Sequence, residues 1–473
     1  MRKVLAFDFG ASSGRAIKAE FDGERITYKE IHRFDNIPIE KDGEVHHDVE
    51  MIFGEIKKAI ALAGDVDSLA FDTWGVDYAL LDENGDIICS PFHYRDERTA
   101  KALDKAEEKM PLIDIYKKTG NQIMNINTLF QLLCDENAKK AKQLLFMPDL
   151  FSYLLCKNAV CEKSIASTSQ MLSPESKKWD EEVLEKFDIP SSLFAPLTDS
   201  ASVVGEYNGI KVISVAGHDT QCAVAAMPTG NKNAAFLSCG TWSLIGCETD
   251  EPILTEESFR LGLSNELGAN SKINYLKNIS GLWLIQETRR DYAKNGESYS
   301  YNELEQFARK AEPFKCFVDP DSPLLSAHGD LPNKIRKYCE KTNQPIPKSV
   351  GEIVRCIYES LAMKYRLALE QISECTERNF EVLHLLGGGT KDGFLCRMTA
   401  DSIGIPVVAG PIEATALGNI ILQLKALGDL SDIESGRRLI AKSEKLLEYI
   451  PNRNSEWDEA YKKFKIIIQE ETL

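Results

Sequence analysis

The sequence predicts an α/β protein made of two similar domains that face a shared cleft. The chain of 473 residues is too long for one ordinary hydrophobic core. An apolar strand, a glycine, a short run of hydroxyl residues and a second apolar strand occur at residues 4–21 and again at residues 234–248. The segment "AMPTGNKN" at 226–233 has the composition of a turn. We therefore expect two domains, at residues 1–230 and 231–473.

The first domain is expected to begin with a buried strand and a phosphate-binding turn. Residues 4–9 are apolar except for Asp8, which at the end of this strand could hold Mg²⁺ through water. The glycines and small hydroxyl side chains at 10–14 let an anion approach backbone N–H groups closely. Alternation around Asp22 and Gly23 predicts a hairpin, so that a strand follows the turn. P-loops and dinucleotide-binding loops need a helix there, and both motifs are disfavoured.

The rest of the chain alternates expected helices and strands. Residues 97–155 have a mostly helical pattern and form an insertion, after the strand in "AFDTWGVDYALL", that helps to cover the cleft. The apolar spacing at 349–379 predicts one long helix. A strand in "EVLHLLGGG" and a helix from about Asp392 come next. The glycines at 387–389 can therefore bring backbone close to a nucleotide.

Composition and charge favour a small-molecule substrate. The net charge is −17 and no stretch is dense in Lys or Arg, which disfavours nucleic acid and anionic membranes as partners. No apolar run approaches the roughly 20 residues needed to span a bilayer, and the N-terminus is too polar for a signal peptide, so we expect a cytoplasmic protein. The 12 cysteines are scattered without a CxxC pair. We interpret them as small buried hydrophobes rather than a disulfide framework or a zinc site.

Two polar segments interrupt apolar strands and are candidates for substrate contacts. In "FDTWGVDY", Asp72 and Asp77 should be hydrogen-bonded either to backbone or to a polyol ligand, because burying an unpartnered carboxylate is costly. Trp74 beside Gly75 offers an apolar face next to a gap, as sugar sites commonly do. The neighbouring histidines at 46–47 are interpreted as structural or as substrate-rim residues, because adjacent histidines do not converge readily on one ion.

The segment "VISVAGHDTQCAVAAM" at 212–227 predicts a buried strand followed by a small-residue helix. Asp219 stands where that helix begins and could be its N-cap. It could equally be the general base that takes a proton from a substrate hydroxyl. The two roles are compatible, and the other motifs favour the base.

Together these segments resemble the FGGY carbohydrate kinases, within the actin, hexokinase and Hsp70 superfamily, and most of all the rhamnulokinase branch. The resemblance spans nearly the whole chain and rests on "DFGASSGR", "FDTWGVDY", "YRDERT", "MPDLFSYLL", "AGHDT", "LSCGTWSLIG", "NISGLWLIQ", "LGGG" and "GPIEATALGNI". It implies two actin-like ATPase (ribonuclease H-like) domains flanking a deep cleft, with the sugar on the N-terminal side and the nucleotide on the C-terminal side. It also implies that ATP, with Mg²⁺, phosphorylates O1 of L-rhamnulose.

The resemblance assigns roles to individual residues. Residues implied to meet the ATP phosphates are Ala11, Ser12, Ser13, Gly14, Arg15 and Thr241. Gly388 would lie against the adenosine. Residues implied to contact the sugar are Gly75, His218, Asp219, Thr220 and Asn302, with Asp219 as the catalytic base. Lys391, Asp392 and Lys310 depart from the family pattern near ATP, which leaves the purine contacts open.

Other functions remain open at this point. A kinase for another ketose such as L-fuculose is the nearest alternative, because a few pocket residues can switch the preferred hydroxyl configuration. Filament proteins and chaperones share the ATPase fold, but Asp219 and "DTWGVDY" would be unexplained acids in a purely mechanical ATPase. A non-catalytic sugar-binding protein is a third alternative. The oligomeric state is left open between monomer and dimer.

Overall fold

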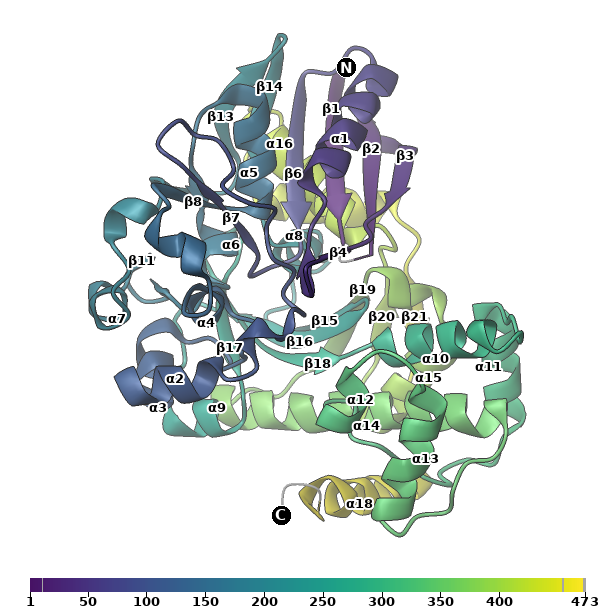
Figure 1. Ribbon diagram of the computed structural model, residues 1–473. Helices are drawn as coiled ribbons and strands as arrows, with labels where there is room; N and C mark the ends of the chain where they lie inside the picture. Colours follow the sequence, from purple (N-terminus) through teal and green to yellow (C-terminus); the bar gives the residue numbers. More distant parts are fainter. Residues whose placement is uncertain (11, 453–454, 471–473) are drawn as a thin grey trace. The chain divides into compact units, whose positions relative to one another are not determined.

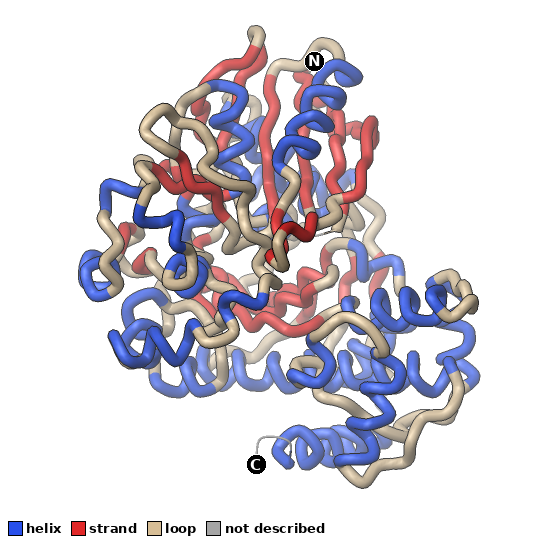
Figure 2. Tube along the Cα trace, in the orientation of Figure 1, coloured by secondary structure: helices blue, strands red, loops and turns tan. Residues whose placement is uncertain are grey.

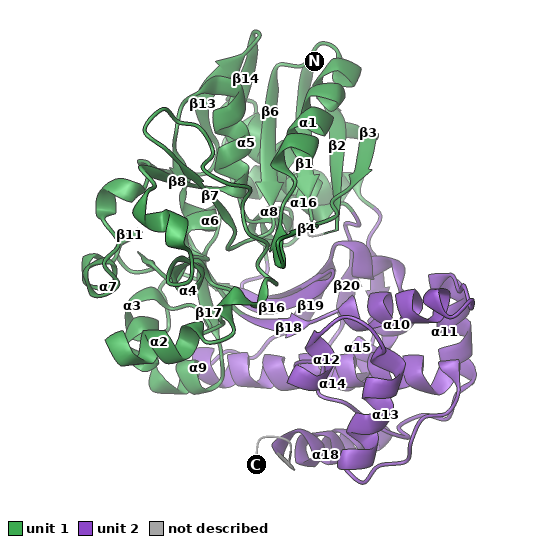
Figure 3. Ribbon diagram, viewed as in Figure 1, with its two compact units in different colours: residues 1–230, 248–276, 413–444 green, residues 231–247, 277–412, 445–473 purple. Residues whose placement is uncertain are grey.

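The computed structural model describes residues 1–10, 12–452 and 455–470, and it is a mixed α/β chain (Figure 1). Ala11, an expected phosphate contact, lies outside the described residues. The chain divides into two compact units, each of which contains helices and strands (Figures 2 and 3). Unit 1 consists of residues 1–230, 248–276 and 413–444, and unit 2 of residues 231–247, 277–412 and 445–473. In the part of the chain that is described, no helix combines the length and the apolar character that crossing a membrane requires.

The main sheet of unit 1 has six strands in the order β13-β14-β6-β1-β2-β3. Strand β1 pairs antiparallel with β2 and parallel with β6, and β2 pairs antiparallel with β3, which confirms the hairpin expected around Asp22 and Gly23. Strand β14 runs parallel to β6, and β13 pairs antiparallel with β14. The carboxyl ends of β1, β6 and β14 therefore meet at one edge of the sheet, which is where ligands bind in open α/β sheets.

Alternation along β1 explains how helices cover both faces of this sheet. Leu5, Phe7 and Phe9 belong to a core cluster that includes α1 and α5. Val4 and Ala6 point to the other face and belong to a cluster with apolar residues of α16. A strand buried on both faces reads as a continuous apolar run, which is the pattern that residues 4–9 show in the sequence.

The second large sheet, most of whose strands belong to unit 2, follows the same plan. Its order is β17-β18-β16-β15-β19-β20-β21, in which β15 pairs antiparallel with β16 and parallel with β19. Strand β20 is parallel to β19, and β21 is antiparallel to β20. The order β18-β16-β15-β19-β20-β21 thus matches β3-β2-β1-β6-β14-β13 of unit 1. The sequence repeat is confirmed as a repeat of sheet topology.

The elements of unit 1 supply the first sheet, its helical cover and the insertion. The strands that lie wholly in it are β1 Arg2–Phe9, β2 Ser13–Phe21, β3 Ile26–Asp35, β4 Ile39–Lys41, β5 Glu44–His46, β6 Ser68–Thr73, β7 Tyr78–Leu81, β8 Gln143–Phe146, β9 Cys161–Glu162, β10 Leu172–Ser173, β11 Lys178–Trp179, β12 Leu197–Thr198, β13 Ser202–Tyr207, β14 Ile210–Ser214 and β17 Ser264–Leu267. The helices are α1 Val49–Ala63, η1 Glu97–Thr99, α2 Ala102–Lys109, α3 Leu112–Thr119, α4 Thr128–Leu132, η2 Glu136–Lys139, α5 Met147–Cys156, α6 Lys163–Ala166, α7 Glu181–Lys186, η3 Ser191–Leu193, α8 Asp219–Ala225, α9 Glu256–Arg260, α16 Ala414–Ala426 and α17 Ile433–Ser443. The mostly helical character expected for 97–155 is confirmed, with β8 inserted.

The elements of unit 2 confirm the long helix expected at 349–379 and the strand–glycine–helix order after it. The strands are β15 Ala234–Cys239, β16 Trp242–Thr249, β18 Ile273–Ser280, β19 Val382–Leu386, β20 Val407–Ala409 and β21 Leu447–Tyr449, with the end of β16 and the start of β18 counted in unit 1. The helices are α10 Trp283–Lys294, α11 Tyr301–Lys310, α12 Pro323–Ser326, α13 Leu331–Lys341, α14 Val350–Thr376, η4 Gly388–Lys391, α15 Gly393–Ile403 and α18 Ser455–Glu470. A capping box at Ser349 and Glu352 fixes the start of α14.

Candidate active site

Three carboxylates lie at the carboxyl edge of the unit 1 sheet. Asp8 and Asp72 are direct partners in the parallel register of β1 and β6. Asp219 begins α8, the helix that follows β14. The strand order therefore brings together three acids that are far apart in the sequence.

Arg15 lies between two carboxylates at this edge. Its guanidinium donates hydrogen bonds to Asp8 and to Glu413, the residue directly before α16. Burial alone would lower the pKa of Arg15, but the two carboxylates raise it further than burial lowers it. A permanently charged guanidinium suits recognition of phosphate oxygens, and Arg15 has further N–H donors beyond these two bonds.

The turn between β1 and β2 is closed by backbone hydrogen bonds. The Gly10 N–H donates to the Ser13 carbonyl at 3.0 Å, and the Asn36 N–H donates to the Ser12 carbonyl at 3.1 Å. Ser12 is exposed, whereas a Cβ on Gly14 would lie 2.2 Å from the ring of Phe34. Gly14 is thus required by packing, and the Ser12 side chain is accessible to a ligand. Phosphate contacts by Ser12, Ser13, Gly14 and Arg15 stay a prediction.

Asp72 is fully buried, and only one of its two carboxylate oxygens has a hydrogen-bond partner among the described residues. Its Oδ2 accepts a hydrogen bond from Asn419 of α16 at 2.7 Å, while Oδ1 has no hydrogen-bond partner among the described residues. Burial, with the nearby charge of Asp8, raises the pKa of Asp72 well above its ordinary value. The expectation that backbone or a polyol would satisfy Asp72 is wrong for Oδ2, because a side chain of α16 does so.

Asp77 is satisfied by the protein itself. It accepts hydrogen bonds from His47 Nε2 at 2.7 Å, Trp74 Nε1 at 2.9 Å, Gln131 Nε2 at 2.9 Å and the Tyr94 N–H at 3.2 Å. Burial would raise the pKa of Asp77, but His47, with His93 and Gln131, outweighs burial and the pKa is lowered. Asp77 therefore stays ionised without a polyol, and the structural interpretation of His47 is confirmed.

His46 is also structural. Its Nδ1 lies 2.9 Å from the Ser90 carbonyl oxygen, to which it can only donate a hydrogen bond, and its ring packs against Phe92. This carbonyl occupies one ring nitrogen, so the two histidines at 46–47 do not act together on one ligand.

Asp219 is the first residue of α8, and His218 occupies the N-cap position, so the N-cap interpretation of Asp219 is wrong. The carboxylate instead accepts a hydrogen bond from the adjacent Thr220 N–H at 2.6 Å. About a third of the side chain, 33%, is exposed. The surrounding protein and the charge of Asp8 raise the pKa of Asp219 above its ordinary value, against the opposing effect of His218. An accessible carboxylate with a raised pKa has the properties of a general base.

His218 is oriented by Glu266 of β17. His218 Nδ1 lies 3.0 Å from Glu266 Oε2, and His218 Nε2 lies 3.5 Å from Asp219 Oδ1. Burial would lower the pKa of His218, but Glu266, with the charges of Asp219 and Glu162, outweighs burial and the pKa is raised. Because a carboxylate only accepts at neutral pH, Nδ1 carries a proton, and Nε2 faces Asp219. A Cβ on Gly75 would lie 3.5 Å from the His218 ring, so the structure brings these two expected sugar contacts together.

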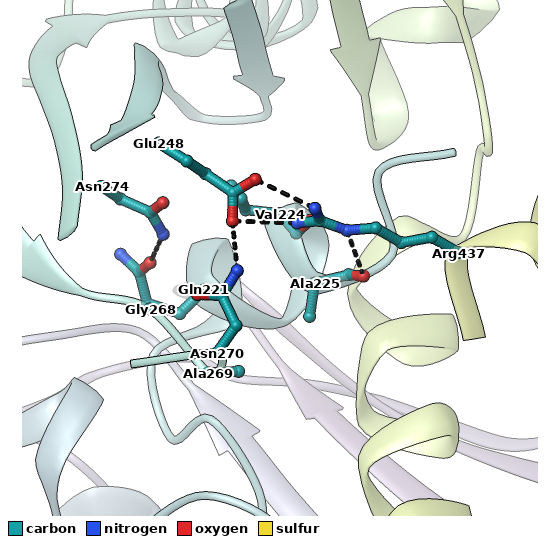
Figure 4. Close-up of a pocket in the computed structure, with 9 residues that line it drawn as sticks. All are labelled: Gln221, Val224, Ala225, Glu248, Gly268, Ala269, Asn270, Asn274 and Arg437. Carbon is teal, nitrogen blue, oxygen red and sulfur yellow. Dashed lines mark hydrogen bonds and ion pairs between the residues drawn. The ribbon is translucent and has the colours of Figure 1, made fainter. Parts of the chain in front are cut away.

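Hydrogen bonds at both ends of α8 hold the segment that carries His218 and Asp219. Buried Glu162 accepts a hydrogen bond from the Gly217 N–H at 3.0 Å. At the other end of α8, Arg437 donates to the Val224 carbonyl and pairs with Glu248 at 2.9 Å, beside a small polar pocket (Figure 4). A helix held at both ends keeps its first residue in a defined position.

The expected nucleotide contacts of unit 2 lie in two glycine turns. Thr241 Oγ1 donates to Gln286 of α10 at 3.3 Å, and the Thr241 carbonyl accepts from the Gly281 and Trp283 N–H groups. A Cβ on Gly388 would meet no atom within 4 Å, which leaves open space beside its backbone. Contacts of Thr241 and Gly388 with ATP stay predictions.

Asp392 and Lys310, which depart from the family pattern near ATP, lie in unit 2, as does the predicted sugar contact Asn302. Asp392 is the N-cap of α15 and also accepts a hydrogen bond from the Tyr358 hydroxyl, which gives it a structural role. Lys310 is exposed at the end of α11, and Asn302 is exposed in the first turn of the same helix. The predicted sugar contact of Asn302 stays a prediction.

Sequence reasoning missed the residues that orient the site. Glu266, Glu413 and Asn419 were not singled out, although Glu413 and Asn419 belong to the segment "GPIEATALGNI". For Glu413 and Asn419, a polar side chain among small and apolar residues was the feature of the sequence that could have indicated a role in the site. Glu266 offered no such signal, because β17 is short and its contact with His218 joins residues 48 positions apart.

Two family models match this chain. Residues 3–236 match the N-terminal domain and residues 235–427 the C-terminal domain of the FGGY family of carbohydrate kinases. The chain is 40% identical to a rhamnulokinase of Bacteroides thetaiotaomicron, over 98% of this chain and 99% of that protein. It is 37% identical to a rhamnulokinase of Bacillus subtilis, over 94% and 95% of the two chains.

Solved structures share the fold at low sequence identity. A ligand-bound xylulose kinase from Lactobacillus acidophilus aligns with a TM-score of 0.79 and 15% identity, over 100% of this chain and 98% of that one. A Plasmodium falciparum glycerol kinase with ADP aligns with a TM-score of 0.78 and 17% identity, over 99% and 97%. These similarities confirm the expected actin-like α/β fold. With two matched domains and full-length relatives, the chain belongs to the FGGY family of carbohydrate kinases.

Proposed function

We propose that this chain transfers the γ-phosphate of ATP to O1 of L-rhamnulose and releases L-rhamnulose 1-phosphate and ADP. The observation that carries the chemistry is the position of Asp219, a partly exposed carboxylate with a raised pKa at the start of a helix held at both ends. The choice of sugar is supported by relatives named rhamnulokinase, which are 35% to 40% identical over nearly the whole chain. Because ATP is the phosphate donor, we place the reaction in the cytoplasm.

In this proposal Asp219 takes the proton from the O1 hydroxyl as the oxygen attacks the γ-phosphorus. The bond from the γ-phosphorus to the bridging oxygen of ADP breaks, and the electron pair leaves with ADP. Phosphoryl transfer needs little covalent help, so a positioned base and well-placed donors account for most of the protein's contribution. The raised pKa of Asp219 makes the carboxylate a better proton acceptor than an ordinary exposed aspartate.

His218 and Gly75 are proposed to position the sugar. Glu266 holds a proton on Nδ1 of His218, so that Nε2 is presented to Asp219 and to a substrate hydroxyl beside it. Gly75 leaves room next to the His218 ring, because a Cβ there would lie 3.3 Å from Thr168 and 3.5 Å from His218. Thr220 and Asn302 complete the proposed sugar contacts.

The proposed phosphate contacts fit the residues of each unit. In unit 1 these are Ser12, Ser13, Gly14 and Arg15, of which Arg15 carries the permanent charge. In unit 2 we propose Thr241 for a phosphate and Gly388 for the adenosine, because the space beside Gly388 is open.

The acids at the carboxyl edge fit a magnesium ion. Mg²⁺ in phosphoryl-transfer sites takes one or two carboxylates, phosphate oxygens and water. Asp8 and Asp72 are register partners, and Asp72 Oδ1 has no hydrogen-bond partner among the residues described, so the donor set is of the right kind. We propose that Asp8 holds Mg²⁺ through water. When bound, the ion offsets negative charge on the phosphates.

The test measures ADP release with Mg²⁺-ATP and a panel of acceptors: L-rhamnulose, L-fuculose, D-xylulose, L-ribulose and glycerol, with a control lacking sugar. We expect rapid turnover with L-rhamnulose and at most slow turnover with the others. Preference for L-fuculose would refute the sugar assignment while leaving a kinase. Equal ADP release without sugar would refute the kinase reaction. Phosphorus NMR of the product distinguishes O1 from other positions of the sugar.

A further inference from the structure

Three cysteines of unit 2 converge at one buried point. The Sγ atoms of Cys316, Cys339 and Cys356 all lie within 4.8 Å of one another. Their residues are 2%, 0% and 2% exposed. They come from the segment between α11 and α12, from α13 and from α14, so the spacing in the sequence gives no sign of the cluster. All three are free and buried, as expected of the cysteines, but their convergence was not expected.

The backbone around this three-thiol cluster is tied down by hydrogen bonds. The Phe317 N–H donates to Gln344 Oε1 at 2.8 Å, and Gln344 Nε2 donates to the Phe317 carbonyl at 2.8 Å. The Val318 N–H donates to Ser360 Oγ of α14 at 2.9 Å, and Ser360 Oγ donates to the Cys356 carbonyl at 2.6 Å. The segment that carries Cys316 is therefore fixed to the loop after α13 and to α14, which presets the distances between the thiols.

We propose that the three-thiol cluster is a binding site for a thiophilic, three-coordinate ion, with trivalent arsenic as the ligand that suits it best. Three sulfurs around one centre at bonds of about 2.3 Å lie about 4 Å apart when the centre is planar, and about 3.5 Å apart around a pyramidal centre such as trivalent arsenic. The sulfurs of the cluster, within 4.8 Å of one another, reach that arrangement by small side-chain movements. This site is independent of the sugar kinase reaction.

The number of ligands argues against zinc. Structural zinc sites are closed by four protein ligands. In the described part of the chain, the cluster contains three cysteines and no fourth His, Cys, Asp or Glu ligand. The thiols are buried, so that water does not readily supply the missing ligand. Soft sulfur ligands in a site of three favour an ion that is stable with three bonds.

The charge of the complex selects the ion further. Three thiolates around a monovalent ion leave a net charge of minus two, and around a divalent ion minus one, and a buried net charge is costly. Three thiolates around trivalent arsenic form a neutral complex. Arsenous acid, As(OH)₃, is uncharged at neutral pH, so its entry carries no charge into the core. One As(OH)₃ and three cysteine thiols give As(S–Cys)₃ and three waters, with no oxidation or reduction.

The three thiols replace the hydroxyls of arsenous acid one after another. A thiolate is the form of cysteine that attacks and ligates, and the two neighbouring thiols then replace the remaining hydroxyls on arsenic.

The test titrates the reduced full-length protein with arsenite under anaerobic conditions. Native mass spectrometry counts bound arsenic and the protons lost, and an assay of the thiols that still react measures their protection. We expect one arsenic per chain, with loss of three protons and protection of three thiols. Zinc chloride, as a comparison, should bind more weakly than arsenite.

Variants separate the cluster from the other cysteines. Cys316→Ser, Cys339→Ser and Cys356→Ser should each weaken arsenite binding by more than about 100-fold, because even partners outside the first ligand shell change metal affinity by about 10- to 100-fold. Cys375→Ser, at the half-buried end of α14, is the matched control and should bind arsenite normally. Circular dichroism checks that each variant is folded, and an alanine replaces any serine that unfolds the chain.

Several results would overturn the proposal. Absence of arsenite binding to the wild-type protein would do so, as would normal binding by Cys339→Ser and Cys339→Ala. Tighter binding of zinc than of arsenite would refute the three-coordinate assignment. A disulfide between two of the three cysteines that persists in the reduced sample would also refute it.

Discussion

Replacing Gly418 with alanine tests the position of the helix that carries Asp219. Gly418 lies in α16 where this helix crosses α8, and a Cβ there would lie 1.8 Å from the Cys222 carbonyl oxygen. That oxygen belongs to the backbone, so no rotamer change relieves the clash. Ordinary van der Waals contact begins at 3.4 Å, so the two helices must separate by roughly 1.6 Å.

Two opposing terms set the expected size of the effect. Alanine in place of glycine in a helix interior favours folding by about 1 kcal/mol. Overpacking a core costs about 1–3 kcal/mol, and a rigid backbone neighbour places this site at the upper end. We therefore expect a net loss of about 2 kcal/mol, which corresponds to a fall in melting temperature of about 4–8 °C.

The same displacement should lower kcat strongly although it lowers the free energy of unfolding only moderately. Cys222 lies one turn after Asp219 in α8, so a shift at Cys222 moves the carboxylate. A misplacement of about 1 Å in an active site costs about 100-fold in rate. We expect Gly418→Ala to lower kcat with L-rhamnulose by about that factor while the protein remains folded at 20 °C.

Gly54→Ala is the matched control. Gly54 also lies inside a helix of unit 1, α1, but a Cβ there would meet no atom within 4 Å. Helix propensity alone should then raise the melting temperature slightly and leave kcat unchanged. Thermal unfolding and steady-state kinetics of both variants decide the question. If Gly418→Ala raised the melting temperature as Gly54→Ala does, the close approach of α8 and α16 would be refuted.

Three further predictions address the site itself. Asp219→Asn should retain ATP and sugar binding and lose at least about 100-fold in kcat, and near-normal turnover would remove Asp219 from the role of base. The ionised form of Asp219 is the base and its pKa is raised, so wild-type kcat should begin to fall on acidification at a pH above the pKa of an ordinary aspartate. Glu266→Gln removes the carboxylate that raises the pKa of His218, so an NMR titration should show His218 losing its proton at lower pH, and an unchanged titration would contradict the pairing. Gly388→Val should change the free energy of unfolding by less than about 0.5 kcal/mol, because the space beside Gly388 is open, and should raise the KM for ATP by about tenfold; an unchanged KM would argue against adenosine at Gly388.

Local patterns in the sequence determine much of the fold. The apolar run at 4–9 and the turn at 22–23 predict β1 and the β2–β3 hairpin, because strand burial and turn chemistry depend on residues close together in the chain. The repeat at 234–248 likewise predicts β15 and β16. The helical spacing at 349–379 predicts α14, whose capping residues are local as well.

The sequence also locates the candidate site, since acids that interrupt apolar strands are costly unless they have a use. That argument selected Asp8, Asp72 and Asp219, which the strand order brings to one edge of the sheet. The same argument selected Asp77, but in the structure side chains of the protein, and not a ligand, bond this carboxylate. His47, Trp74 and Gln131 satisfy this carboxylate. The sequence identifies a buried acid, but not its partners.

Those partners are decided by tertiary structure alone. Glu266 orients His218 from 48 positions away, and Glu413 reaches Arg15 from 398 positions away. The three-thiol cluster joins three segments in the same manner. Periodicity, capping and turn chemistry act over a few residues and so can be read along the chain, whereas a hydrogen bond or an ion pair depends on distance in space, which only the packing of sheets and helices sets.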